Sequence, residues 1–203
     1  MIETILLVRH GQTRSNITGA YMGWTNEDLN DTGHSQANRL CSRLSKQPID
    51  LIYSSPLQRT RTTATILAEP HGLKVGTSDA FIEIKLGDWE GLHMDEISQR
   101  WPELWKQWRA DPSQISLPNG ESFNQVNRRV GQFFEQMVAS TQCKLAIIVT
   151  HDIVVKSIVS HVLGAPASIY RQFNIDNASI SKVRFIDGKA RLTTMNDTSH
   201  LSI

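Results

Sequence analysis

The sequence predicts an α/β fold with a buried central sheet, and three patterns support this prediction. Residues 5–8 and 145–149 are unbroken aliphatic runs, which suit strands that are buried on both faces. Segments in which apolar residues recur at helical spacing alternate with the strand-like runs along the chain. Near the C-terminus, the strand-like runs 180–186 and 190–195 meet at Asp187-Gly188, which favours a hairpin turn.

Length and composition limit the classes of protein to consider. The 203 residues suffice for one α/β domain, which we expect to span residues 1–203. A formal net charge of +1 and the lack of a Lys/Arg-rich run give no reason to expect a nucleic acid as partner. The N-terminus leads directly into a strand, and no apolar run reaches the ~20 residues that span a bilayer. We therefore expect a cytoplasmic protein that does not bind membranes.

The first strand ends in Arg9, His10 and Gly11. Because open α/β sheets bind their ligands at the carboxyl ends of their strands, Arg9 and His10 are candidate site residues. Gly11 would let the chain turn where a side chain would obstruct it. Residues 14–31 are rich in Gly, Asn and Thr, which predicts a long loop over this end of the sheet. The first helix is then expected at residues 33–44.

A second strand at residues 49–53 leads into a helix with a candidate anion-binding residue. Ser55 as N-cap and Pro56 at the first helical position predict a helix that runs to about Ala68. Arg59 would lie in its first turn, where unpaired N–H groups and the helix dipole already favour an anion. Either a bound anion or a nearby carboxylate would then balance this arginine.

The middle of the chain contains an acid and a tryptophan stripe. Glu83 lies between two isoleucines, so in a strand its carboxylate would face solvent or a cleft on the opposite side. Trp101, Trp105 and Trp108 follow at helical spacing and would either join the core or cap a pocket.

The second half of the chain repeats the opening pattern. A long helix is expected after the N-cap Ser122. The strand 144–150 stops at His151, and a helix over residues 153–163 ends at Gly164. A second histidine therefore follows a buried strand.

These residues together suit a phosphoryl group. Two guanidinium groups, from Arg9 and Arg59, and two imidazoles, from His10 and His151, would share the carboxyl-end crevice, where arginines repel zinc and bind phosphoryl oxygens. We expect no metal and no cofactor. A neutral His10 could attack phosphorus, while the arginines and a protonated His151 stabilise the equatorial oxygens. Glu83 could protonate the leaving group.

Five motifs in this order resemble the histidine phosphatase superfamily, in its phosphoglycerate mutase-like branch. They lie at residues 7–16, 23–24 with 29–37, 54–64, 83–91 and 149–151, and the resemblance extends in the right order over nearly the whole chain. The resemblance implies His10 as the phosphorylated nucleophile, Arg9, Arg59 and His151 as the phosphate pocket, and Glu83 as proton donor. It also implies a three-layer α/β/α fold with a mostly parallel central sheet and one antiparallel edge strand.

Departures from the mutases of this family bear on the substrate. Those mutases have Leu-x-Glu-Arg at the acid and an arginine pair in the following insert, whereas this chain reads Phe-Ile-Glu-Ile-Lys at residues 81–85 and its helical insert, at about 92–121, lacks Arg-Arg. Gln12 also replaces a glutamate that is usual in the mutases. The sequence therefore looks more like the small phosphatases, which include α-ribazole phosphatases. Lys85 could replace a missing arginine, and Asp152 stands where relatives commonly have glycine.

The expected function is metal-independent hydrolysis of small-metabolite phosphomonoesters through a phosphohistidine. The alternatives are a cofactor-dependent phosphoglycerate mutase and an inactive domain that binds a phosphorylated ligand. We expect a monomer or homodimer whose partner is a small phosphorylated metabolite. The leaving group is expected to lie against residues 19–29 and 101–117. The residues expected to bind substrate are Asn16, Gln12, Thr13, Thr150, Gly23, Trp24 and Lys85.

Overall fold

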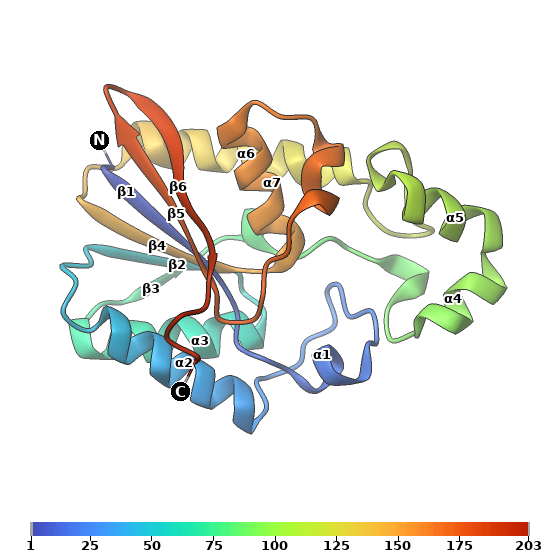
Figure 1. Ribbon diagram of the computed structural model, residues 1–203, viewed down its shortest axis with the longest axis horizontal. Helices are drawn as coiled ribbons and strands as arrows, with labels where there is room; N and C mark the ends of the chain where they lie inside the picture. Colours follow the sequence, from blue (N-terminus) through green and yellow to red (C-terminus); the bar gives the residue numbers. More distant parts are fainter. Residues whose placement is uncertain (1, 203) are drawn as a thin grey trace.

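The structure is a computed structural model that describes residues 2–202, and within these residues six strands form one sheet (Figure 1). The strands are β1 (Thr4–Arg9), β2 (Leu51–Ser54), β3 (Val75–Thr77), β4 (Leu145–Thr150), β5 (Ile180–Ile186) and β6 (Lys189–Asp197). Their order in the sheet is β3-β2-β4-β1-β5-β6. The first four are parallel, whereas β5 runs antiparallel to β1 and forms a hairpin with β6. The predicted mixed sheet with an antiparallel edge is confirmed.

Helices cover both faces of the sheet (Figure 1). The helices are α1 (Arg14–Thr18), α2 (Asp31–Leu44), α3 (Gln58–Ala68), α4 (Met94–Arg100), α5 (Pro102–Ala110), α6 (Phe123–Ser140) and α7 (Asp152–Leu163). Shorter 3-10 turns include η2 (Asp79–Phe81) and η5 (Ala167–Gln172). Helices α2 and α3 pack on one face and α6 and α7 on the other, which confirms the three-layer prediction. Helices α4 and α5 project beyond the sheet. No helix in residues 2–202 is long and apolar enough to cross a membrane.

The aliphatic run of β1 supplies both faces of the core. Leu6 and Val8 pack with α2 and α3, whereas Ile5 and Leu7 pack with α6 and α7. All four are buried, and each such side chain contributes about 1.5–3 kcal/mol when it leaves water. Strand β4 is buried at every position in the same way. These two strands therefore form the rigid centre from which the polar residues at their ends are presented.

Three parallel strands end at the same edge of the sheet. The amide of His10, just after β1, donates to the carbonyl of Thr150 at 3.0 Å. The amide of Ser55, just after β2, donates to the carbonyl of Val149 at 3.1 Å. Since β4 lies between β1 and β2, these bonds bring the ends of all three strands together.

Three local expectations differ from the structure. Helix α3 begins at Gln58 with Leu57 as N-cap, while the Ser55 hydroxyl accepts from the Leu57 amide at 3.4 Å and is hydrogen-bonded to His151 Nε2 at 2.9 Å. Part of the expected loop after β1 forms α1, whose N-cap Thr13 and residue Asn16 make a capping box. The segment around Glu83 is also not a strand, since η2 precedes it and no regular element contains it. The hydrophobic pattern of the sequence does not predict the side-chain hydrogen bonds at these positions.

Glycine is required at position 11 by a close backbone contact and not by a turn. Its backbone does not have a positive φ, but a Cβ on Gly11 would lie 2.5 Å from the carbonyl oxygen of Gly33. A Cβ on Gly33 would in turn lie 2.1 Å from the carbonyl oxygen of Gln12. The end of β1 and the first turn of α2 therefore touch backbone to backbone, which fixes His10 against the helix layer.

Gly33→Ala should lower the free energy of unfolding by about 1–3 kcal/mol, as overpacking does in rigid surroundings. Gly131→Ala is a matched control in α6, because its Cβ would meet only His161 Nδ1 at an ordinary 3.5 Å. That control should instead raise stability by roughly 0.5–1 kcal/mol, since glycine disfavours a helix interior. Urea unfolding measures both changes. Equal changes of the same sign in the free energy of unfolding of the two variants would contradict the close contact between Gly33 and Gln12.

Candidate active site

His10 is held as a neutral imidazole with one free nitrogen. Its Nδ1 lies 2.7 Å from the carbonyl oxygen of Gly11, and because a carbonyl only accepts, Nδ1 carries the proton. Nε2 is then the unprotonated nitrogen. Burial, followed by the positive charges of Arg59 and Arg9, holds the pKa of His10 well below its ordinary value. The ring is therefore a nucleophile at neutral pH.

Arg9 and Arg59 are anchored by neutral groups. Arg59 Nη1 and Nη2 donate to the carbonyls of Thr25 and Gly23, each at 2.8 Å, and Arg9 Nη1 donates to the carbonyl of Ile175 at 2.5 Å. Arg9 Nε is buried with no hydrogen-bond partner in residues 2–202. Neither arginine forms an ion pair within those residues. Their orientation is fixed by carbonyl oxygens and not by a direct carboxylate partner, which leaves guanidinium N–H groups to bind an anion.

His151 lies behind His10, with the two ring centroids 5.2 Å apart. It is fully buried, its Nε2 is bonded to the Ser55 hydroxyl, and its Nδ1 has no partner in the described part of the chain. Burial, then Arg59 and His10, lower the pKa of His151 well below its ordinary value. In the ligand-free protein these effects favour the neutral ring, whereas the sequence analysis expects a protonated His151 against a bound phosphoryl group. A neutral ring can still donate one hydrogen bond from Nδ1.

Glu83 has the opposite electrostatic environment. Its Oε1 accepts from the amide of Ile84 at 2.9 Å and its Oε2 from the amide of Ile153 at 3.4 Å. Burial raises the pKa of Glu83, the negative charge of Asp152 raises it further, and these hydrogen bonds and Arg59 act in the opposite direction. The carboxyl group therefore holds a proton more readily than an ordinary glutamate does.

An arginine that the sequence analysis missed holds the Glu83 backbone in place. Arg129 Nη2 and Nη1 donate to the carbonyls of Glu83 and Ala80 at 3.0 and 2.8 Å. Its guanidinium also pairs with Glu121 at 2.9 Å. Trp24 Nε1 donates to the same Glu83 carbonyl at 2.7 Å. These bonds replace the ladder that a strand would have supplied.

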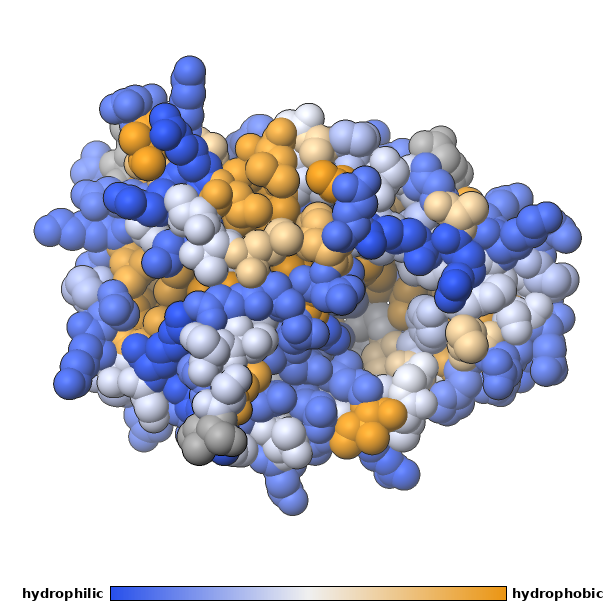
Figure 2. All heavy atoms as spheres, in the orientation of Figure 1, coloured by the Kyte–Doolittle hydropathy of each residue, from blue (hydrophilic) through white to orange (hydrophobic). Residues whose placement is uncertain are grey.

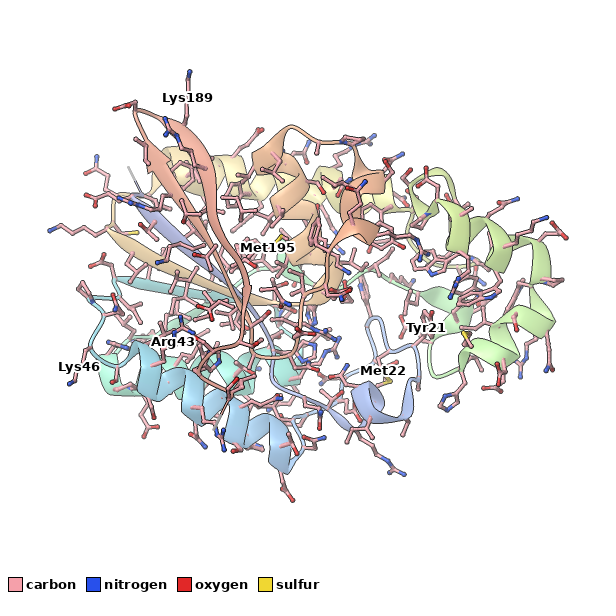
Figure 3. The ribbon with its side chains drawn as sticks, viewed as in Figure 1. Tyr21, Met22, Arg43, Lys46, Lys189 and Met195 are labelled. Atoms are coloured by element: carbon pink, nitrogen blue, oxygen red, sulfur yellow. The ribbon has the colours of Figure 1, made fainter. Side chains whose placement is uncertain are left out.

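These groups open onto a cavity of about 420 Å³. The space-filling view is hollowed between the lobe of α4 and α5 and the rest of the molecule (Figure 2). Tyr21 and Met22, on the segment after α1, line the cavity on the side of this lobe (Figure 3). Arg9, His10, Arg59 and Glu83 also line it, together with Trp108, Asp152, Tyr170 and Arg171. His151 lies beneath this surface.

The expected substrate-binding residues divide into two sets. Thr13, Asn16 and Gly23 line the cavity. Asn16 Oδ1 accepts from the amide of Thr13 at 3.0 Å and from Asn177 Nδ2 at 3.1 Å, which leaves its own amide nitrogen as a donor.

Gln12, Thr150, Trp24 and Lys85 do not line this cavity. The side-chain oxygen of Gln12 accepts from Asn30, and the Thr150 hydroxyl donates to the carbonyl of Phe81. Lys85 is exposed, with Nζ 5.6 Å from the centre of the Trp24 ring. These four side chains therefore support the site from outside or lie at the surface.

Other wall residues had no signal in the sequence. Tyr170 and Arg171 lie on η5, which has no hydrophobic period. They reach the cavity because η5 packs against α7 and because Arg171 Nη2 donates to the carbonyl of Trp108. Asp152 was noticed as an unusual residue after His151, and it does line the cavity.

The comparisons with known proteins agree with this geometry. Residues 5–198 match the histidine phosphatase superfamily (branch 1). The chain is 34% identical over 197 residues to phosphoserine phosphatase 1 of Hydrogenobacter thermophilus, covering 97% of this chain and 93% of that protein. It is 30% identical over 190 residues to the adenosylcobalamin/alpha-ribazole phosphatase of Salmonella typhimurium, covering 94% of each.

Solved structures show the same fold. The alpha-ribazole phosphatase of Shigella flexneri superposes with a TM-score of 0.88 at 28% identity, covering 96% of each chain. The match along the sequence, the relatives and this shared architecture lead to one assignment. The chain belongs to the histidine phosphatase superfamily, branch 1.

Proposed function

We propose that the protein hydrolyses phosphomonoesters of small metabolites through a phosphohistidine on His10. The observation that carries this proposal is a buried, neutral His10 with a free Nε2, placed beside two arginines that form no ion pair within residues 2–202. Relatives named as phosphatases of phosphoserine and of alpha-ribazole support a small phosphorylated metabolite as substrate. The arginines supply the positive charge that phosphoryl transfer needs at its equatorial oxygens.

In the first half of the reaction, Arg9 and Arg59 bind the phosphoryl oxygens and His10 Nε2 attacks phosphorus. The bond from phosphorus to the ester oxygen breaks, and Glu83 gives its proton to the departing alkoxide. His151 can donate from Nδ1 to a phosphoryl oxygen while Ser55 donates to Nε2. Asn16 offers a further neutral donor.

In the second half, Glu83 is a carboxylate and accepts a proton from water. That water attacks phosphorus, the bond from phosphorus to His10 breaks, and inorganic phosphate is released. Glu83 is then protonated again and His10 is neutral. We propose that residues 1–203 act as one domain in which the helical insert at about 92–121 covers the leaving group.

Replacing the nucleophile should abolish turnover. His10→Ala is expected to lower kcat for p-nitrophenyl phosphate on the order of 10³-fold or more, since no other group can form the covalent intermediate. His34→Ala, an exposed histidine on α2, is the control and should keep wild-type activity. Both are assayed in excess EDTA. Full activity in the His10 variant would refute the mechanism.

The loss of activity on replacing Glu83 should depend on the leaving group of the substrate. Glu83→Gln is expected to lower kcat/KM for β-glycerophosphate by about 10²-fold or more, because a departing alkoxide needs a proton. The loss should be much smaller for p-nitrophenyl phosphate, whose phenolate departs without one. Glu103→Gln, on the exposed surface of α5, is the control. Equal losses for both substrates would show that Glu83 is not the proton donor.

A further inference from the structure

The first turn of α7 contains an ion pair that the proposed reaction does not use. Asp152 Oδ2 lies 3.0 Å from Lys156 Nζ, one helical turn further along. Lys156 is only 8% exposed, and its ammonium lies 5.4 Å from the centre of the Tyr170 ring. A buried lysine with one carboxylate partner is costly to leave unpaired, so Lys156 fixes where the Asp152 carboxylate lies.

Asp152 and Glu83 are neighbours across the cavity wall. Both line the same cavity, and the residue after Asp152 donates its amide to Glu83 Oε2 at 3.4 Å. Because both carboxyl groups line one cavity, the negative charge of Asp152 disfavours ionisation of Glu83. Lys156 is the direct ion-pair partner of Asp152.

The other charged groups around Glu83 either favour its ionised form or contact only its backbone. Arg59, from α3, favours the carboxylate, as do the two amides that donate to it. Arg129, from α6, contacts the Glu83 carbonyl and is paired with Glu121. Asp152, on α7, is therefore the charged group that acts in the same direction as burial: both raise the pKa of Glu83.

We propose that Asp152 is a positioning residue for the proton of Glu83: held by Lys156, its carboxylate keeps Glu83 in the acid form that the first half of the reaction consumes. This inference rests on the proposed function, since it assigns Asp152 a role in the same proton transfer. It makes no covalent change to Asp152 or Lys156. The pair acts through charge alone.

The test is the pH dependence of kcat/KM for β-glycerophosphate, which reports the ionisation of the free enzyme. Asp152→Asn keeps an oxygen for Lys156 and removes the negative charge. The pKa of Glu83 should then fall, so the alkaline limb of the profile should move to lower pH. Asp95→Asn, an exposed acid on α4, is the matched control and should leave the limb in place.

A second variant distinguishes an effect of charge on the pH profile from general damage to the fold. Lys156→Met removes the cation that offsets the charge of Asp152, while the N-terminus of α7 still favours that carboxylate, so the alkaline limb should move to higher pH, opposite to Asp152→Asn. In the Glu83→Gln background this limb should be absent, and adding Asp152→Asn should not create one. Shifts of the two single variants in the same direction, or no shift in Asp152→Asn, would overturn the proposal. Failure of the proposed function is distinct, because the wild-type protein would then release no phosphate.

Discussion

The structure depends on gathering the half-buried Arg9, the buried Arg59 and two buried imidazoles at one edge of a sheet, with no ion pair to either arginine within residues 2–202. Carbonyl oxygens from the segment after α1 and from the one before β5 hold Arg59 and Arg9 instead. The remaining positive charge, added to burial, holds His10 and His151 neutral. The same constraint produces both an anion site and an unprotonated nucleophile inside it.

The acid and the nucleophile are separated by environment as well as by position. Burial and the positive charges of Arg59 and Arg9 lower the pKa of His10, whereas burial and the negative charge of Asp152 raise the pKa of Glu83. Each shift favours the protonation state that the first half of the reaction needs. The start of α7 contacts both the nucleophile and the acid. His151, which lies beside His10, is its N-cap, and the amide of Ile153 donates to Glu83.

The sequence was informative where a strong local pattern coincided with the function. The aliphatic runs before His10 and His151 predicted two buried strands, and parallel strands necessarily end at one edge. Gly11 was correctly noticed, although the reason is its contact with Gly33. Arg129 and Arg171 could not be found in this way, because contacts across 46 and 63 residues of chain give them their roles. Ser55 was taken as a helix cap for the same reason, since only the folded chain shows its bond to His151.

The central claim is that the phosphoryl group passes through His10. The most direct measurement is rapid mixing of the protein with excess substrate, an alkaline quench that preserves phosphohistidine, and mass spectrometry of the digested chain. The account predicts a transient phosphoryl group on His10 that forms before free phosphate appears and decays as the substrate is exhausted. Steady release of phosphate with His10 never phosphorylated, or with the phosphoryl group on another residue, would contradict it.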